Sequence, residues 1–192
     1  ARFTDGSRFE ESKPLFGPTI ICGWANVHGY PVGIVGNNGA IYPDSAQKAA
    51  HFVQLCNKID TPIIFLQNVT GFLVGKEFER DGIIKKGSQL INAVSNSTVP
   101  HITIILGASY GAGTYAMSGR AYNNRFTFIW PSAKIAVMGG KQIAGVMSLV
   151  RKARAFRKGE KFDEDEDKKF TEAVERIQDQ GSKALEATGL IS

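Results

Sequence analysis

The first half of the chain alternates short apolar runs with one long segment of helical periodicity. Two apolar runs, Ile20–Val27 and Val32–Gly36, flank the turn residues His28-Gly29-Tyr30-Pro31, and this pattern predicts a β-hairpin. A helix is predicted to begin at Pro43, because a proline in the first turn has no amide hydrogen to leave unpaired, and to stop before Pro62. Its apolar positions follow helical spacing at Ala49, Phe52, Val53, Cys56 and Ile59.

The second half of the chain repeats this alternation. Strands that alternate with helices indicate an α/β fold with mainly parallel pairing. The predicted strands are Ile63–Leu66, His101–Leu106, Phe126–Trp130 and Ile135–Met138. The predicted helices cover roughly 82–96, a short segment that ends near Gly119, 142–154 and 170–187.

Length and composition describe a globular chain. Its 192 residues fit one domain, or one half of a larger two-lobed subunit. The first residue is Ala1 rather than Met, so we expect a fragment of a longer protein. Hydrophobic residues make up 43% and charged residues 21% of the chain, and no apolar run is long enough to span a membrane.

Cysteine, histidine and charge patterns exclude several classes of site. Cys22 and Cys56 form no CxxC pair, and His28, His51 and His101 lie far apart, so neither a disulfide framework nor a metal site is expected. The net charge is +5, but the basic residues form no continuous patch with interleaved aromatic residues, which argues against nucleic acid as a partner.

Much of the positive charge lies in one run that an acidic run follows directly. We interpret the segment 157–169 as a solvated, charged linker, and a contact to a phosphorylated ligand or a partner subunit is the alternative. The basic residues are Arg151, Lys152, Arg154, Arg157, Lys158 and Lys161, and the acidic run extends from Asp163 to Asp167.

The predicted turn Gly107–Gly113 is the strongest candidate for a binding site. It follows an apolar strand and opens a helix, and its small residues would let a ligand approach the backbone closely. The first amides of a helix have no partner inside the helix, and with the helix dipole they attract negative charge. Such a site can bind a phosphate or stabilise an oxyanion, and a tight packing turn is the alternative.

The same turn matches the nucleophile elbow of α/β hydrolases. Gly107-Ala108-Ser109-Tyr110-Gly111 fits the pattern G-x-S-x-G. That elbow requires an acid and then a histidine later in the chain, and all three histidines precede Ser109. A serine hydrolase that uses Ser109 is therefore kept only as an alternative.

Two further glycine-containing segments follow predicted strands. The segment Gln67–Gly75 begins at a strand end, where open α/β sheets bind ligands, and Phe72 would cover a flat ligand there. The segment Trp130–Gly140 ends with two glycines at a predicted helix start. A surface loop in which Phe72 covers the core is the simpler interpretation of the first segment, and a packing turn is that of the second.

Together and in this order, the three segments resemble the carboxyltransferase β-subunit of biotin-dependent acyl-CoA carboxylases. The resemblance is strongest to the methylcrotonoyl-CoA and geranyl-CoA carboxylase branch, and it is carried by QNVTGFLVG, SYGAGTYAMSGRAY and WPSAKIAVMGG. It implies an α/β crotonase-like (ClpP/crotonase) fold, a layered spiral of ββα units. The family subunit has two such lobes, and residues 1–192 are similar to the C-terminal one as a single domain.

The resemblance also implies site residues. The amides of Ala112 and Gly113 would form the hole for the biotin ureido oxygen, and Tyr115 would line the acyl pocket. The oxyanion hole for the thioester and most of the CoA site would belong to the other lobe, and no metal is implied in this one. The remaining residues implied to bind biotin are Val69, Thr70, Gly71, Phe72, Tyr110 and Gly111.

The family reaction is carboxyl transfer from carboxybiotin to an acyl- or enoyl-CoA. The resemblance implies biotin carried covalently by a biotin carboxylase or biotin carrier subunit, and a homo-oligomer with its active site between subunits. This lobe would then be inactive alone. The implied location is the cytoplasm of a bacterium or the mitochondrial matrix of a eukaryote, with neither nucleic acid nor membrane as a partner.

Two questions stay open from the sequence. A non-catalytic docking or assembly lobe of a carboxylase complex is the alternative to a catalytic one. Lys141 follows the paired glycines where the methylcrotonoyl branch usually has glutamate, and this departure leaves the acyl chain of the substrate unassigned.

Overall fold

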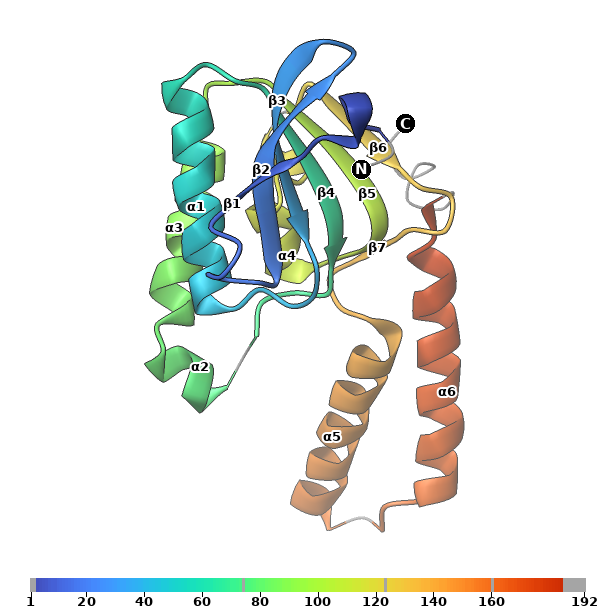
Figure 1. The fold of residues 1–192 in the computed structure, drawn as a ribbon. Coiled ribbons are helices and arrows are strands. Elements are labelled where there is room, and N and C mark those ends of the chain that lie inside the picture. Colours follow the sequence, from blue (N-terminus) through green and yellow to red (C-terminus); the bar gives the residue numbers. More distant parts are fainter. Residues whose placement is uncertain (1–2, 74, 123, 160, 185–192) are drawn as a thin grey trace.

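A twisted sheet forms the centre of the chain, and two long helices project away from it (Figure 1). The computed structural model describes residues 3–73, 75–122, 124–159 and 161–184. The strands are β1 (Glu10–Ser12), β2 (Ile20–Val27), β3 (Tyr30–Asn37), β4 (Ile63–Val69), β5 (His101–Tyr110), β6 (Phe126–Ile129) and β7 (Lys134–Ala136). The helices are α1 (Pro43–Lys58), α2 (Lys76–Arg80), α3 (Ile83–Ser95), α4 (Gly111–Ala116), α5 (Gly140–Lys158) and α6 (Glu164–Gly181), with 3-10 turns at Asp5–Ser7 and Arg120–Tyr122.

The strand order is β1-β2-β3-β4-β5-β6, and β7 pairs with β5. Strands β1, β2 and β3 pair antiparallel, whereas β3 to β6 pair parallel, as do β5 and β7. Helix α1 connects β3 to β4, and α2 and α3 connect β4 to β5. The predicted α/β fold with mainly parallel pairing is confirmed. Because β4 and β5 are parallel neighbours, their carboxyl ends meet at one edge of the sheet.

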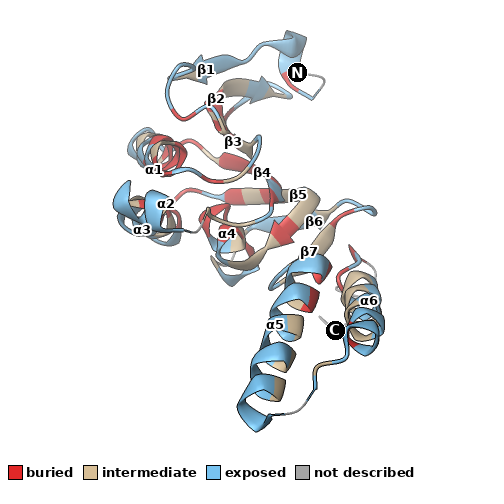
Figure 2. Cartoon of the chain, turned by 90° about the horizontal axis from the view of Figure 1, so that it is seen from below, coloured by how far each residue is buried: buried red, intermediate tan, exposed pale blue. Residues whose placement is uncertain are grey.

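The main core lies between the sheet and helices α1 and α3, where the buried residues gather (Figure 2). Phe52 of α1 and Phe65 of β4 are fully buried, and the Trp24 ring lies 4.6 Å from the Phe52 ring between centroids. Successive strand residues face opposite sides, so Ile64 belongs to a second, smaller cluster on the other face. The helical spacing predicted for α1 identified its buried side at Ala49, Phe52, Val53 and Cys56, whereas Ile59 follows the helix and is 58% exposed.

Helix α1 also buries a lysine. Lys48 is 1% exposed, and its ammonium group lies 3.4 Å from a carboxylate oxygen of Glu11 in β1. An ammonium group taken out of water is costly unless a carboxylate accompanies it. The ion pair therefore connects the outer strand β1 to the helix that covers the core.

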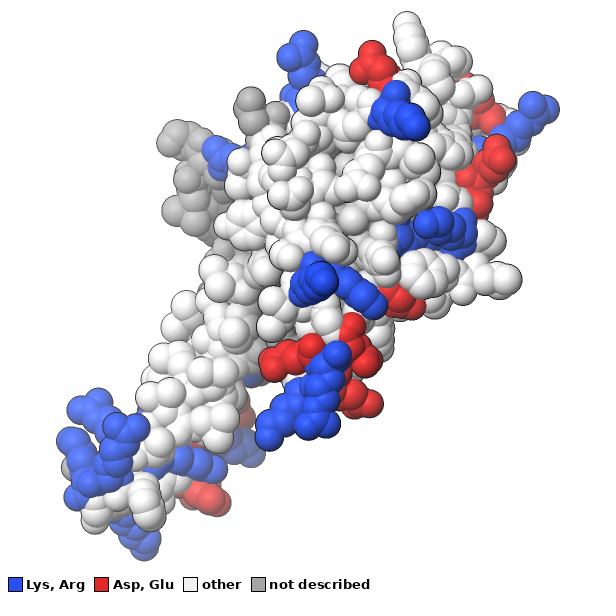
Figure 3. All heavy atoms as spheres, turned by 90° about the vertical axis from the view of Figure 1, so that its left-hand side faces the viewer, with Lys and Arg blue, Asp and Glu red and all other residues white. Residues whose placement is uncertain are grey.

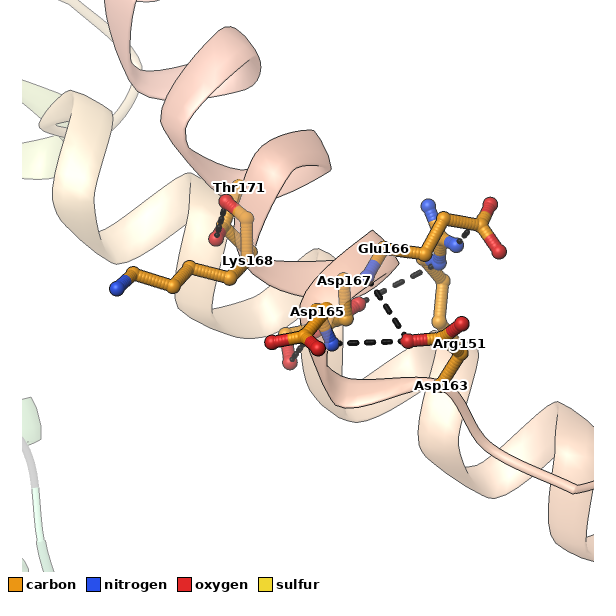
Figure 4. A network of polar contacts seen from close by, with 8 residues as sticks. Arg151, Asp163, Asp165, Glu166, Asp167, Lys168 and Thr171 are labelled. Atoms are coloured by element: carbon orange, nitrogen blue, oxygen red, sulfur yellow. Dashed lines mark hydrogen bonds and ion pairs between the residues drawn. The ribbon is translucent and has the colours of Figure 1, made fainter.

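The projecting helices α5 and α6 correct the prediction of a charged linker over 157–169. Helix α5 continues to Lys158, and α6 begins at Glu164 rather than at residue 170. The Asp163 carboxylate caps α6, because it accepts hydrogen bonds from the amides of Asp165 at 2.9 Å and Glu166 at 3.0 Å (Figure 4). Negative charge in a first helical turn is favoured by the helix dipole, which accounts for the acidic run.

Charges of opposite sign also connect the two projecting helices. Arg151 of α5 contacts Glu166 at 3.1 Å and Asp167 at 3.4 Å (Figure 4). Further along α5, basic side chains gather at the free end of the hairpin (Figure 3). No described helix, α5 and α6 included, is long and apolar enough to cross a membrane.

Other boundaries differ from the predictions for local reasons. The β2–β3 turn consists of His28 and Gly29 alone, and both have positive φ (51° and 82°), as a tight hairpin turn requires. Strand β5 continues to Tyr110, because its last residues pair with β7. Residues 107–110 are therefore strand rather than turn. Helix α4 ends at Ala116 instead of near Gly119, and the short helix α2 was missed.

Candidate functional site

The change from strand β5 to helix α4 occurs within one residue. Gly111 has a φ of +57°, in the left-handed region that side chains other than glycine rarely adopt. A Cβ atom on Gly111 would also lie 3.1 Å from the carbonyl oxygen of Val137, which is close. The glycine thus lets the chain turn sharply and lets the segment before α5 approach it.

The first turn of α4 holds two backbone donors that have no partner inside the helix. No side chain caps the helix, and among the described residues the amides of Ala112 and Gly113 donate to no side chain and to no carbonyl of a loop or turn. Ala112 is exposed, whereas Gly113 is buried. Donors without partners at the start of a helix are suited to an anionic oxygen.

Gly113 is required by packing, a reason that the sequence did not indicate. A Cβ atom on Gly113 would lie 2.6 Å from Cγ2 of Val69 and 3.1 Å from Cα of Gly71. The missing side chain therefore makes room for the loop after β4. Ala112 is the donor residue whose own side chain is exposed.

Two asparagines hold the loop after β4 in place. The Asn68 side chain accepts a hydrogen bond from the amide of Ala108 at 2.9 Å. Asn37, at the end of β3, accepts from the Asn68 amide at 2.7 Å and donates to the Asn68 carbonyl at 2.5 Å. The register between β4 and β5 shifts at this point. Sequence reasoning assigned neither residue a role, since a contact between residues so far apart has no local signal.

The other residues predicted on this loop have different environments. Val69 is fully buried against Gly113, and Thr70 is exposed. Phe72 forms a bridge with Ile41, and its half-buried ring packs at the edge of the main core. Phe72 thus covers the core, as the simpler interpretation expected, and it also faces a cavity.

That cavity is apolar and measures about 260 Å³. It lies between the loop after β4 and helices α2 and α3, and Ala112 forms part of its wall. The methyl group of one donor residue therefore belongs to an apolar surface. Tyr115, expected in the acyl pocket, is absent from the described lining; it is 46% exposed, with its ring 6.0 Å from that of Tyr122 between centroids.

The third glycine-containing segment, Trp130–Gly140, also lies at the start of α4. Strand β7 pairs with the end of β5, which brings Val137 against Gly111. The Tyr110 ring lies near Gly139, where a Cβ atom would be 3.5 Å from Cε2 of the ring. All three glycine-containing segments therefore meet at the start of α4.

Ser109 has the surroundings of a structural residue. It is fully buried, and its hydroxyl donates to the Gln67 side chain at 2.8 Å and lies 2.9 Å from the Thr114 hydroxyl. The Gln67 amide in turn donates to the Met117 carbonyl at 2.5 Å, so the network fixes α4 to β4. A nucleophilic serine needs a histidine within hydrogen-bond reach. Among the described contacts Ser109 has none, and the hydrolase alternative gains no support.

Both ring nitrogens of His101, the first residue of β5, lie within hydrogen-bond distance of serine hydroxyls. Its Nδ1 lies 2.8 Å from the Ser118 hydroxyl and its Nε2 lies 2.7 Å from the Ser97 hydroxyl. Burial lowers the pKa of His101 from 6.5 to about 4, because the charged imidazolium would lose its hydration. The imidazole is therefore neutral in the folded chain near neutral pH.

This pKa predicts a pH-dependent stability. Above pH 6.5 the His101 imidazole is neutral in both the folded and the unfolded chain. Between pH 6.5 and about 4 it binds a proton only in the unfolded chain. The free energy of unfolding should therefore fall by about 3 kcal/mol more in the wild type than in His101→Gln over this range. Urea unfolding at a series of pH values measures the difference, and parallel pH profiles would contradict the assignment.

Comparison with known proteins gives the family. The carboxyl transferase domain matches residues 1–188. The chain belongs to the carboxyl transferase family. The "Probable biotin-dependent acyl-coenzyme A carboxylase beta2 subunit" of Mycobacterium tuberculosis is 53% identical over 192 residues, which are 100% of this chain and 36% of that protein. The mitochondrial methylcrotonoyl-CoA carboxylase beta chain of Dictyostelium discoideum is 48% identical over 183 residues, 95% of this chain and 31% of that protein.

A solved carboxyl transferase structure has the same fold. The β subunit of P. aeruginosa geranyl-CoA carboxylase aligns with a TM-score of 0.91 and 44% identity, over 98% of this chain and 35% of that one. The family and the crotonase-like fold expected from the three segments are confirmed. This carboxyl transferase chain spans about a third of the length of these relatives.

Proposed function

We propose that this chain is the lobe of an acyl-CoA carboxylase that binds biotin while a carboxyl group passes from carboxybiotin to an acyl- or enoyl-CoA. One observation carries the proposal: three segments distant in the sequence converge on two backbone donors in the first turn of α4, at Ala112 and Gly113, that no described side chain or loop carbonyl accepts from. Family membership supplies the reaction class for this geometry.

When bound, carboxybiotin supplies the carboxyl group, and negative charge develops on its ureido oxygen as that group leaves. The amides of Ala112 and Gly113 would donate to this oxygen and stabilise the charge. Their positions are fixed beforehand, because Gly113 packs on Gly71 and the Gln67–Ser109 network holds α4. Donors fixed before the reaction need no reorganisation during it.

The surroundings of the donors fit the bicyclic ring of biotin. Ala112 presents only a methyl group, so a flat ligand can approach the amides closely. Phe72 lines the cavity that Ala112 borders, and Val137, which is 83% exposed, lies close to Gly111. Both are apolar and suit the ring, while the amides suit its polar oxygen.

The remaining parts of the reaction are proposed to come from outside the lobe. The thioester oxyanion hole and most of the CoA site would belong to the first lobe of a neighbouring subunit in a homo-oligomer. Biotin would arrive on a carrier subunit. The relatives act on methylcrotonoyl-CoA and geranyl-CoA by their names, and we propose a substrate of this class, in the cytoplasm or the mitochondrial matrix.

Transfer of labelled carbon tests the proposal. The full-length subunit and its biotin-carrying partner would be supplied with ATP and labelled bicarbonate, and acid-stable label would be counted. We expect label that depends on methylcrotonoyl-, geranyl- or propionyl-CoA and disappears when avidin blocks biotin. Carboxylation of the partner's biotin without transfer to any thioester would contradict the proposal and favour a non-catalytic assembly lobe.

A further inference from the structure

We infer that the apolar cavity between the loop after β4 and helix α3 receives the acyl chain of the CoA thioester. The inference rests on the proposed function, because it assigns part of the substrate to a surface beside the proposed donors. It adds a chain-length selector formed chiefly by α3, a helix that lies outside the three sequence motifs.

The walls of the cavity are hydrocarbon. They are formed by Phe72 and Leu73 of the loop and by Ile83, Ile84 and Ile91 of α3. The Phe72 ring can lie on α3 because residue 87 is glycine, where a Cβ atom would be 3.1 Å from the ring. A glycine thus sets the depth of the cavity on this side.

The polar residues at the cavity do not make its interior polar. The Ser88 hydroxyl donates to the Lys85 carbonyl at 2.8 Å, so its hydrogen is already used within α3. Glu79 is exposed, and its carboxylate can remain in water at the rim. A polar group placed inside would lose hydrogen bonds with water and gain few in return.

The size of the cavity fits part of a substrate. Its volume of about 260 Å³ is below the roughly 300–1,000 Å³ typical of sites that enclose a whole ligand, so a complete acyl-CoA is too large. It exceeds the roughly 150 Å³ of an apolar cavity that binds benzene. A hydrocarbon chain of about six carbons or more therefore fits, and the phosphates of CoA do not.

The position of the cavity relates it to the reaction. Ala112 supplies both a proposed donor amide and part of the cavity wall. A chain in the cavity would therefore end beside the donors, close to the carboxyl group being transferred. The ureido group of biotin is polar and would be poorly accommodated inside, which leaves the cavity to the hydrocarbon part of the thioester.

Narrowing the cavity tests the inference in the full carboxylase complex. Ile84 is 70% exposed, so Ile84→Trp adds bulk at the cavity without disturbing the buried core. Ile59→Trp is the matched control, because Ile59 is 58% exposed and follows α1 outside this cavity. The measurement is kcat/KM for saturated and 2-enoyl thioesters from propionyl- to decanoyl-CoA, and the KM for the biotinylated carrier.

The expected result is a change in selectivity between long and short acyl chains. Burial of each methylene group of the acyl chain strengthens binding about fourfold. If the tryptophan of Ile84→Trp displaces about two methylenes from the cavity, the ratio of kcat/KM for long thioesters to that for short ones should fall about fifteenfold. The ratio in Ile59→Trp should equal that of the wild type.

Three results would overturn the inference. An unchanged ratio in Ile84→Trp would show that the acyl chain lies elsewhere. An equal loss for every thioester, with a raised KM for the carrier, would assign the cavity to the biotin arm. A wild-type complex that carboxylates no thioester would remove the proposed function itself, and the inference with it.

Discussion

Replacing Ala112 with valine should lower the rate of carboxyl transfer by about two to three orders of magnitude, the usual effect of removing one donor from an oxyanion hole. The two added methyl groups would stand beside the exposed amide and keep the ureido oxygen from reaching it. Because Ala112 is exposed, the free energy of unfolding should change by only about 0.5 kcal/mol. The measurement is acid-stable label transferred by the full complex, with urea unfolding of the chain in parallel.

The control for this variant is Ala112→Gly, which keeps the backbone donor and adds no bulk. It should retain most of the transfer rate. Gly113→Val is a poorer test, because its side chain would collide with Val69 and Gly71 and change the loop as well. Full activity in the Ala112→Val complex would remove these amides from the mechanism.

Replacing Glu11 with alanine should reduce the free energy of unfolding by about 3 kcal/mol, because the buried ammonium group of Lys48 would lose its carboxylate. Lys48→Met should cost less, since methionine fills much of the same apolar space and Glu11 can be hydrated. The double variant should therefore be more stable than Glu11→Ala alone. Urea unfolding of the four chains measures the coupling, and strictly additive changes would contradict a stabilising ion pair.

Elements with a local signal were predicted well. The start of α1 at Pro43 and the buried side of that helix follow from proline chemistry and helical spacing. The end of β5 did not follow from a local signal, and the local cap at the start of α6 was overlooked. Tyr110 is in a strand because β7 pairs with it, and α6 starts early because Asp163 caps it beside the basic helix α5. A tertiary partner thus decided the first boundary, whereas a local cap that had been interpreted as part of a charged linker decided the second.

In the candidate site, too, features with a local sequence signal were predicted and features that depend on tertiary contacts were not. Glycines between a strand and a helix are a local pattern that indicated donors within Gly107–Gly113, and the family resemblance implied Ala112 and Gly113 among them. The sequence did not reveal how Asn37 and Asn68 join β3, β4 and β5, since that arrangement depends on the register of the sheet. It also did not reveal that Gly113 packs against Val69, since these residues are far apart in the sequence.

The hairpin of α5 and α6 affects how the chain can be handled in the laboratory. Its helices contact chiefly each other, and Leu149, Val150 and Phe156 are 67%, 61% and 88% exposed. Large side chains of this kind on an isolated chain favour self-association. Purification of the lobe by itself will therefore call for a solubilising fusion, a mild detergent or polar replacements along α5.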